Sequence, residues 1–365
     1  MTRVVGHIDI DYFYAQVEEV ENPSLKSRPV IICVFSGRTE DSGVVSTANY
    51  VARGFGVHSG MPIASAKRKL TGKDPAVIRM DHEKYEIVSA RIMEDLEQKV
   101  DLLEPTGIDE AFFDLTTWAG DFGRARKDAE SIKESLLRNE HLTCSIGLGR
   151  SKVVAKLASD TAKPGGLLVI PPDSTEAFLS PLPVSKLYGV GPKTAASLDE
   201  MGIKTIGELA RAPPAELESR FGRKFGGYLL SASSGTDSDP VVAGLEPTQF
   251  SRIVTLAHDT RDPREAYDRL SDGIDYVQGK LDSSGKAPRT ITAIGILTDL
   301  STKTKSKTFD APVADLAAIR ETTLILFEEL SKVVERDFRR VGVRVSGFEK
   351  TEDQTSLSEF VRPAG

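Results

Sequence analysis

The feature that most constrains the fold of this chain is a change of pattern along its length. Strand-like and helix-like segments mix up to about residue 170, whereas residues 174–233 show several short helical patterns and no convincing strand. Residues 234–247 have the Ser-, Gly-, Asp- and Pro-rich composition of an exposed linker, and β-rich runs return from Phe250 to Phe348. At roughly 150 residues per domain, 365 residues provide for two to three domains. We therefore expect an α+β multidomain chain with a small helical unit in its middle.

Composition narrows the class of protein. The chain has a net charge of −7, 39% hydrophobic and 28% charged residues, which is typical of a soluble globular protein and excludes a mainly disordered one. No apolar run approaches the ~18 residues that span a bilayer, and the first residues lack a long apolar segment, so we expect neither membrane insertion nor secretion. Cys33 and Cys144 are isolated, which fits a reducing cytoplasm and excludes a disulfide scaffold or a cysteine-based zinc site.

Acidic residues follow two of the expected strands. Asp9 and Asp11 are two positions apart at a strand end, so they share a face; Asp109 and Glu110 are adjacent and can converge only at a turn, which residues 105–107 supply. Carboxylates from two β-segments form a hard oxygen site suited to Mg²⁺ rather than zinc. Two such ions ~3.5–4 Å apart serve in-line nucleotidyl transfer. Helix capping or pairing with Lys and Arg is the alternative, and the residues alone do not choose between Asp9 and Asp11.

Three other patterns suit phosphate. Tyr50 and Arg53 lie one helical turn apart, where a hydroxyl and a guanidinium can meet a triphosphate; an Arg stacked on a Tyr is the alternative. A glycine turn precedes an expected helix and contains Gly189, Gly191 and Lys193. Such a turn offers free amides to a phosphate; a plain turn between helices is the alternative. Cations near the β-rich runs can bind the phosphates of a duplex, and a solvated sheet edge that blocks aggregation is the alternative. These cations are Arg252, Lys303, Lys305, Lys307, Arg339, Arg340 and Arg344. Such a basic face is compatible with an acidic whole chain.

Six segments form a specific pattern in order and spacing: residues 7–18 (HIDIDYFYAQVE), 35–38 (FSGR), 47–53 (TANYVAR), 107–111 (GIDEA), 145–148 (SIGL) and 162–166 (AKPGG). With them, nearly the whole chain resembles the Y-family DNA polymerases, especially the archaeal DinB-like translesion branch. The resemblance implies a right-hand polymerase with a ferredoxin-like palm (1–10 and 77–165), small fingers (11–76) and a helical thumb with a helix-hairpin-helix (166–233). It further implies a linker (234–247), an α+β little finger (248–350) and a flexible tail (351–365).

The resemblance also assigns roles to residues. Asp9 and Asp109 match the carboxylates that bridge two Mg²⁺ ions, for which Mn²⁺ can substitute; Glu110 completes the site, the Ile10 backbone carbonyl is a ligand, and Asp11 is not. Side chains that match contacts to the nucleotide phosphates are Tyr50, Arg53 and Lys163, joined by the backbone amides of Tyr12 and Phe13. Tyr14 matches the steric gate that collides with a ribose 2′-hydroxyl.

The activity implied is template-directed DNA synthesis past lesions, with low fidelity and no proofreading. Small residues near the nascent pair (Val34, Val44, Ala48 and Gly60) indicate a roomy site, and no segment is left for an exonuclease. A catalytically silent primer-template scaffold and a nucleotide cyclase with a similar palm are the alternatives. The intact set of Asp9, Asp109 and Glu110 argues against the scaffold, and the thumb-like and little-finger-like modules argue against the cyclase.

The expected partners are primer-template DNA, a dNTP and a sliding clamp. Gln354, Leu357 and Phe360 resemble a clamp-binding peptide, in which a second aromatic residue usually stands where this chain has Val361. A helical turn would place Leu357 and Phe360 side by side as apolar plugs. We expect a monomeric, cytoplasmic enzyme without membrane contact.

Overall fold

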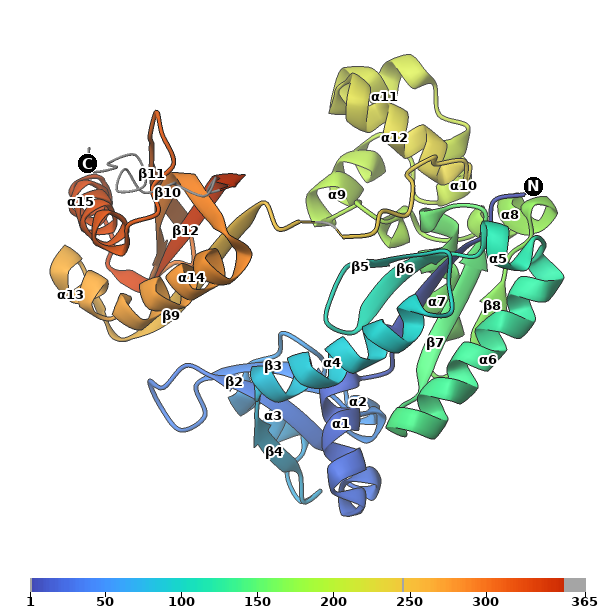
Figure 1. The fold of residues 1–365 in the computed structure, drawn as a ribbon, viewed down its shortest axis with the longest axis horizontal. Helices are drawn as coiled ribbons and strands as arrows, with labels where there is room; N and C mark the ends of the chain where they lie inside the picture. The colour runs from blue at the N-terminus through green and yellow to red at the C-terminus, as the bar shows by residue number, and fades with distance from the viewer. Residues whose placement is uncertain (1, 245, 351–365) are drawn as a thin grey trace, which may run out of the picture. The chain divides into compact units, whose positions relative to one another are not determined.

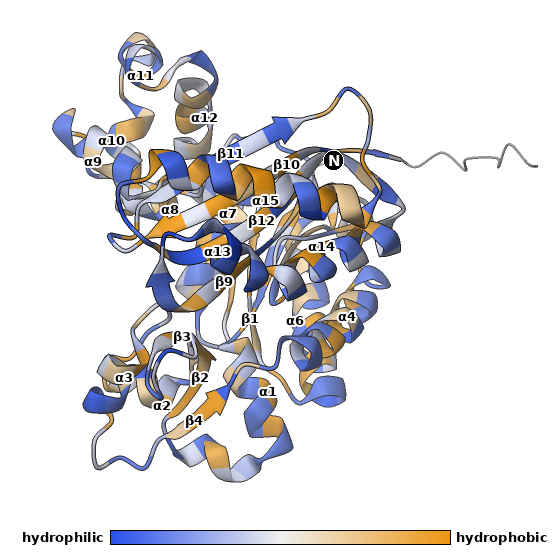
Figure 2. Ribbon diagram, turned by 90° about the vertical axis from the view of Figure 1, so that its left-hand side faces the viewer, coloured by the Kyte–Doolittle hydropathy of each residue, from blue (hydrophilic) through white to orange (hydrophobic). Residues whose placement is uncertain are grey.

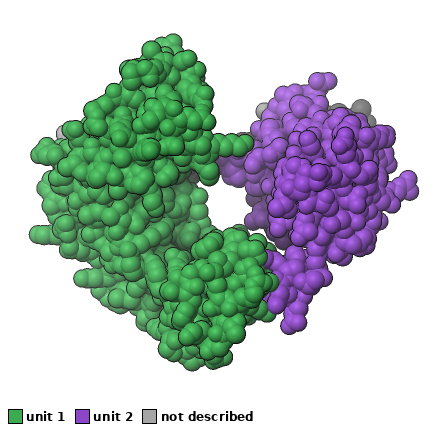
Figure 3. All heavy atoms as spheres, turned by 180° about the vertical axis from the view of Figure 1, so that it is seen from behind, with its two compact units in different colours: residues 1–34, 44–245 green, residues 35–43, 246–365 purple. Residues whose placement is uncertain are grey.

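The computed structural model describes residues 2–244 and 246–350 and divides the chain into two compact units. One unit comprises residues 1–34 and 44–245, and the other comprises residues 35–43 and 246–365 (Figure 3). None of the helices within the described ranges has the length and apolar character needed to cross a bilayer.

The first unit is built on a five-stranded sheet with the strand order β5-β6-β1-β7-β8 (Figure 1). Its neighbours are antiparallel except the pair β7/β8, and its strands are β1 (Val5–Ile10), β5 (Leu102–Pro105), β6 (Glu110–Asp114), β7 (Cys144–Gly149) and β8 (Leu167–Val169). Helices α4 (His82–Glu97) and α6 (Phe122–Glu140) pack on one face, and α7 (Lys152–Ala162) packs on the other. The short α5 (Thr116–Ala119) precedes α6.

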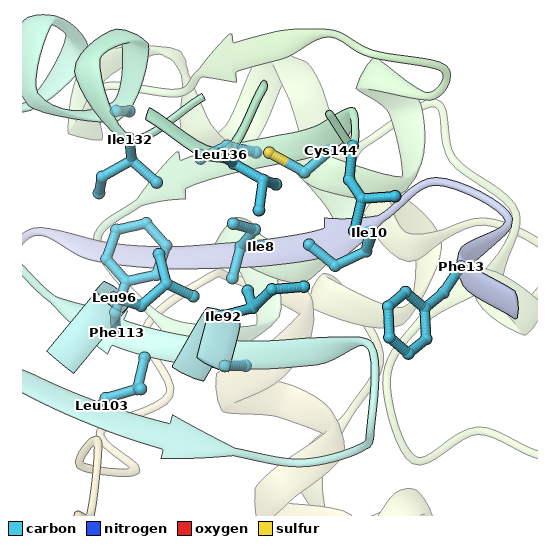
Figure 4. Close-up of a cluster of buried hydrophobic side chains, with 14 of the residues drawn as sticks. Ile8, Ile10, Phe13, Ile92, Leu96, Leu103, Phe113, Ile132, Leu136 and Cys144 are labelled. Atoms are coloured by element: carbon cyan, nitrogen blue, oxygen red, sulfur yellow. The ribbon is translucent and has the colours of Figure 1, made fainter. Parts of the chain in front are cut away.

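Strand alternation assigns a different chemistry to each face of this sheet. Ile8, Ile10 and Phe113 point toward α4 and α6. Ile92 of α4 and Ile132 of α6 lie on the apolar faces of these helices and complete a buried apolar layer (Figure 4). The residues between them in β1 and β6 therefore point toward α7. The apolar core lies on one side, and the polar strand residues are gathered on the other.

The close approach of α7 to the sheet depends on Gly147 in β7. A Cβ atom there would lie 2.1 Å from the carbonyl oxygen of Ala155 and 2.2 Å from the amide nitrogen of Ser159, both in α7. Any larger residue would therefore displace the helix. This glycine therefore allows α7 to lie directly against β7.

A small sheet with the order β3-β2-β4 follows the first strand in sequence. Its members are β2 (Val30–Phe35), β3 (Gly43–Ala48) and β4 (Ala76–Arg79), with α1 (Phe13–Glu21), η1 (Pro23–Ser27), α2 (Tyr50–Gly54) and α3 (Ile63–Lys69) beside them. Strands β2 and β4 are parallel and largely hydrophobic (Figure 2), as is usual for parallel strands.

Residues 172–233 contain only helices, as the sequence predicts. They are η2 (Pro172–Ser174), α8 (Thr175–Leu179), η3 (Val184–Lys186), α9 (Pro192–Glu200), α10 (Ile206–Ala210), α11 (Pro214–Phe221) and α12 (Arg223–Ser233). Their core contains Leu198, Leu217 and Leu229 and continues into Leu157 of α7. The helical module therefore shares its core with the same helix that covers the polar face of the sheet.

The prediction that residues 234–247 form an exposed linker is wrong for its first half. Val241 is 4% exposed and packs on Val5 and Phe112 of the sheet, and the Arg3 guanidinium donates to the backbone carbonyls of Asp237 and Asp239. The composition of the segment does not reveal this, because the apolar residues that bury Val241 lie in strands distant in sequence. The segment from Thr236 to Val242 is thus a strap fixed to the sheet.

Glu104 of β5 secures the end of this strap. Its side chain is 8% exposed, binds the Lys152 ammonium and accepts a hydrogen bond from the Val242 amide at 2.8 Å. Because Glu104→Ala leaves a largely buried cation unpaired, we expect it to lower the free energy of unfolding by about 3 kcal/mol in urea titrations. Glu134→Ala, on the exposed side of α6, is the matched control and is expected to stay within about 0.5 kcal/mol of the parent. Equal values for both variants would contradict the role of Glu104.

The second unit contains a four-stranded antiparallel sheet in the order β11-β10-β12-β9. The strands are β9 (Gln249–Thr260), β10 (Lys286–Leu297), β11 (Thr302–Thr308) and β12 (Phe338–Lys350), and the helices are α13 (Pro263–Asp268), α14 (Ser271–Ser284) and α15 (Leu316–Val333). Ile291, Ala293 and Val343 point toward the helices and form the core with Leu326 of α15. This module is the predicted α+β unit.

Candidate active site

Asp9 and Glu110 lie opposite each other on neighbouring strands. They are Cα partners in the β1/β6 ladder, and both point toward α7 by strand alternation. Asp109 precedes β6 in the turn, where its carbonyl accepts from the Ile10 amide at 2.8 Å. The turn itself is closed by the amides of Thr106 and Gly107, which donate to the carbonyl of Glu110. The predicted turn therefore brings the two acidic segments to one end of the sheet.

Helix α7 and the residue after it supply lysines to these carboxylates. The Lys163 ammonium lies 2.6 Å from Asp9 Oδ2, and the Lys156 ammonium lies 2.7 Å from Glu110 Oε2. Asp160 lies near both lysines, at 3.7 Å from Lys156 and 3.4 Å from Lys163. The site is consequently a cluster of alternating charges between the sheet and the helix.

Burial governs the electrostatics of this cluster. It raises the pKa of Asp9 to about 6, against the opposing influence of Lys163. Burial and then the charge of Glu110 raise the pKa of Asp109. The His7 side chain, whose Nε2 lies 3.6 Å from Glu110 Oε2, and the Lys156 ammonium lower the pKa of Glu110 to about 2. An added positive charge stabilises the ionised form of desolvated neighbouring carboxylates such as these.

The donor set fits a hard divalent cation. Asp9, Asp109 and Glu110 offer carboxylate oxygens at one end of the sheet, where the Ile10 amide also binds the Asp109 carbonyl. Within the described residues no three Asp, Glu, His or Cys side chains converge closely enough to hold a metal ion. In the structure Asp9 and Glu110 each bind a lysine, so a cation at this site would compete with or supplement those ammonium groups.

Asp11 is in a different environment from Asp9, although the two positions are equivalent by strand spacing. Its carboxylate, 1% exposed, accepts hydrogen bonds from Thr143 Oγ1, Ser145 Oγ and the Gly165 amide at 2.8, 2.8 and 2.9 Å. Three protein donors satisfy the carboxylate. Asp11 therefore ties β1 to β7 and to the loop after α7, which leaves Asp9 facing the acidic turn.

The start of α1 places three aromatic residues next to the carboxylates. Tyr12 caps the helix with φ at 36°, Phe13 is 1% exposed in the core, and Tyr14 is half-buried. The first-turn amides of the nine-residue α1 have no backbone acceptors within the helix, so they are available to an anion. Burial first and then the charge of Asp109 raise the pKa of Tyr14.

Tyr50 and Arg53 of α2 belong to the same region. The Arg53 guanidinium lies 5.1 Å from the centre of the Tyr50 ring and donates to the Ala48 carbonyl at 2.8 Å. Tyr50 packs edge-on against Tyr12 at 4.9 Å, and its raised pKa arises from burial first and then from Asp11, with Lys163 opposing. The Arg–Tyr stacking named as the alternative is therefore present, and it is made by the same two residues that are predicted to hold phosphate.

The glycine turn of the helical module has a backbone geometry that allows close approach of a phosphate. Gly189 has a φ of 83°, and Gly191 is the N-cap of α9, with Lys193 exposed in the first turn. Tyr228 Oη donates to the Tyr188 carbonyl at 2.6 Å and holds the turn from behind. The turn therefore presents its glycines and Lys193 to solvent.

Strand pairing divides the predicted cations of the second unit between two faces. Lys303, Lys305 and Lys307 pair with the core-facing residues of β10, so they share one face, as predicted, and it is the helix face. Arg252 is also on that face and lies 5.0 Å from the Tyr276 ring of α14. Arg340 and Arg344 lie on the opposite face among hydroxyl residues such as Thr292 and Ser306, whereas Arg339 lies at a register shift. The sequence showed that the three lysines of β11 share one face of their strand. Only the register of β11 on β10 shows that this is the face covered by the helices.

Two further residues were missed by the sequence analysis. Lys156 looked like one of many helical lysines, and Tyr85 fitted the apolar face of α4. Their spacing carries no signal of function, because only the packing of α7 and α4 on the strands places them at the site. Gln354, Leu357 and Phe360, predicted to bind a clamp, lie outside the described residues.

Comparison with known proteins agrees with this geometry. The model of the impB/mucB/samB family matches residues 8–160, its C-terminal domain matches 247–358, and the DNA polymerase-iota thumb domain matches 185–237. The chain is 41% identical to DNA polymerase IV of Methanosarcina acetivorans, over 99% of this chain and 100% of the relative. It is 38% identical to DNA polymerase IV of Nitrosopumilus maritimus, over 98% and 99%.

Solved structures show the same likeness. A chimera of the Y-family DNA polymerases Dbh and Dpo4 matches with a TM-score of 0.90 at 34% identity, over 95% of this chain and 99% of the chimera. An insertion ternary complex of Dbh DNA polymerase matches with a TM-score of 0.68 at 34% identity, over 94% and 98%.

A polar sheet face with paired carboxylates, followed by a helical module and a separate α+β module, defines a DNA-directed DNA polymerase of the right-hand kind. The chain belongs to the Y family of these enzymes, in the DNA polymerase IV or DinB-like branch, which confirms the resemblance and the fold class. Enzymes of this family are metal-dependent nucleotidyltransferases.

Proposed function

We propose that this polymerase copies template DNA past lesions, with Asp9, Asp109 and Glu110 holding two Mg²⁺ ions, or Mn²⁺ in their place, at the end of β1 and β6. The observation that carries the proposal is the ladder pairing of Asp9 with Glu110, with Asp109 in the adjoining turn. Bound metal supplies Lewis acidity that activates a primer 3′-hydroxyl and neutralises the charge of the transferred phosphoryl group. The Ile10 carbonyl adds a neutral oxygen to the set.

The incoming dNTP is positioned by groups around the same carboxylates. Tyr50, Arg53 and Lys163 are assigned to the phosphates, because Arg53 and Tyr50 form one hydroxyl–guanidinium pair and Lys163 binds Asp9. The backbone amides of Tyr12 and Phe13 add donors at the start of α1. Tyr14 is assigned to the sugar, where its ring excludes a 2′-hydroxyl.

Primer extension tests the activity directly. The parent protein, a primed template and all four dNTPs should give full-length product with Mg²⁺ and none with excess EDTA. A template with one abasic site, run beside an undamaged one, should also be copied. A catalytically silent scaffold would give no product on either template, and a cyclase would consume free nucleotide without extending the primer.

Primer-template DNA is assigned to the glycine turn of α9 and to the cations of the second unit. Gly189, Gly191 and Lys193 present amides and one ammonium to a backbone without reading sequence. In the second unit we place the DNA on the face of Arg340 and Arg344, where hydroxyls accompany the cations. The lysines of β11 and Arg252 lie on the opposite, helix-facing side of the sheet, outside this contact, and Arg339 lies at the register shift beside it.

Salt dependence tests that placement. Arg344→Ala is expected to reduce the slope of log K against log salt by about 1, since one phosphate contact is lost. Lys305→Ala, in the same sheet but beside Glu329 of α15, is the matched control and should leave the slope unchanged. Fluorescence anisotropy of labelled primer-template at several salt concentrations measures both. The opposite pattern would place the DNA on the helix face.

The tail is assigned to a sliding clamp through Gln354, Leu357 and Phe360, which rests on sequence pattern alone. Deleting residues 351–365 should abolish clamp-stimulated primer extension and leave basal extension unchanged. Leu357→Ala combined with Phe360→Ala should reproduce the deletion in the full-length chain. Undiminished stimulation of either variant would remove the tail from clamp binding.

A monomeric cytoplasmic enzyme fits this assignment. All three carboxylates come from one chain and one unit, so no second copy is required to complete the site. Cys33 and Cys144 are buried free thiols, as suits a reducing compartment.

A further inference from the structure

The ring of Tyr14 rests on a second aromatic residue. Tyr85 of α4 stacks against it with the ring centres 4.3 Å apart and the planes inclined by 16°. Tyr14 is near the start of α1 and only half-buried, whereas Tyr85 is fully buried. One face of the proposed steric gate is therefore covered by a residue from a different helix.

Tyr85 is itself firmly held. Its hydroxyl donates to Glu18 Oε1 at 2.6 Å, and Glu18, 9% exposed, is paired with the ammonium of Lys84. Lys84 also pairs with Glu21 at 3.1 Å. Phe13 packs against the Tyr85 ring at 6.3 Å. Hydrogen bonding, charge and packing thus fix both ends of the Tyr85 side chain.

The stack covers one face of the Tyr14 ring, at the start of the helix that follows Asp9 and Asp11. Tyr14 follows Asp11 by three positions in the first turn of α1, so the ring that Tyr85 supports comes directly after the strand end that carries Asp9. A steric gate excludes a 2′-hydroxyl only if it cannot rotate or retreat when the larger sugar presses on it. Packing against an immobile ring provides that resistance, because a side chain in a close-packed setting has few alternative rotamers.

We propose that Tyr85 is a positioning residue that holds the Tyr14 ring in place and so sets how strongly ribonucleotides are rejected. The proposal rests on the assigned role of Tyr14. Tyr85 does not touch the nucleotide; it acts through the ring that does. Without its support, Tyr14 yields to the 2′-hydroxyl.

The decisive readout is the ratio of kcat/KM for a dNTP to kcat/KM for the matching rNTP. Tyr85→Leu removes the stacked ring and is expected to lower this ratio about tenfold, the order of magnitude that an aromatic pair contributes. Tyr85→Phe keeps the ring and loses the hydrogen bond to Glu18, and a drop of about threefold is expected. A purely structural role would reduce both kcat/KM values equally and leave the ratio unchanged.

Two further variants keep the test specific. Ile92 lies in the same helix as Tyr85 and is 2% exposed in the apolar layer. Ile92→Ala removes buried volume without removing the stack, so its ratio of dNTP to rNTP kcat/KM should match the parent. In the double variant Tyr14→Ala/Tyr85→Leu, the ratio should equal that of Tyr14→Ala alone, because Tyr85 acts through Tyr14.

Each outcome decides between the inference and its premise. If Tyr14→Ala lowers the ratio but neither Tyr85 variant does, the role of Tyr85 is wrong and the gate stands. If Ile92→Ala lowers the ratio as much as Tyr85→Leu, the effect is general loosening and the inference fails. If Tyr14→Ala leaves the ratio unchanged, the proposed gate itself is wrong. Should Tyr85→Leu not fold, Tyr85→Phe decides the question by the same ratio.

Discussion

Replacing Asp109 with alanine is expected to lower single-turnover nucleotidyl transfer by about 10³-fold or more, because losing a carboxylate that would hold the metal ions would remove several kcal/mol of transition-state stabilisation. Primer-template affinity should remain near the parent value, since the proposed DNA contacts come from other parts of the chain. Rapid-quench primer extension with saturating dNTP and Mg²⁺ measures the first effect. Anisotropy of the labelled primer-template measures the second.

The control for this prediction is Asp173→Ala, an exposed aspartate of η2. It removes the same charge from the same unit and should leave the rate unchanged. A rate for Asp109→Ala within a few-fold of the parent would defeat the metal assignment. A rate loss accompanied by an equal loss of DNA affinity would instead indicate that the variant misfolds or that Asp109 contacts DNA.

Replacing Tyr14 with alanine is expected to lower discrimination against ribonucleotides on the order of 10²-fold, because the clash that excludes the 2′-hydroxyl disappears. The change should lie mainly in the rNTP value of kcat/KM, with the dNTP value falling less. Steady-state incorporation of dCTP and rCTP opposite a template guanine measures both values. Trp118→Ala, an aromatic residue 46% exposed on α5, provides the control and should leave the ratio unchanged. Equal rejection of rCTP by Tyr14→Ala and the parent would show that another group excludes the hydroxyl.

Sequence reasoning was most successful where the signal is local. The turn at residues 105–107, the helix-capping glycine turn before α9 and the strand-free stretch now seen as α8 to α12 depend on neighbouring residues. The resemblance to the Y family then predicted that Asp9, Asp109 and Glu110 share one site, and strand pairing sets Asp9 opposite Glu110. The local elements required residue type and spacing alone, whereas the site residues required the resemblance.

It was less successful where a side chain's partner comes from elsewhere in the fold. Spacing made Asp9 and Asp11 equivalent, yet Thr143, Ser145 and Gly165 satisfy Asp11 from strand β7 and the loop after α7. The strap at Val241 looked like an open linker because its apolar seat lies on β1 and β6. In both cases the deciding contact joins residues more than 100 positions apart.

The amino-acid sequence by itself determined the modular order of the chain, its family and the acidic residues at the ends of two strands, because periodicity, turn chemistry and motif spacing are properties of short segments. The tertiary structure alone decided which groups satisfy Asp11, which face of the second sheet carries Arg340 and Arg344, and that Tyr85 stacks on Tyr14. Those outcomes depend on strand register and on helices packing across sheets. Register and packing minimise the free energy of the whole fold, and no single segment encodes them.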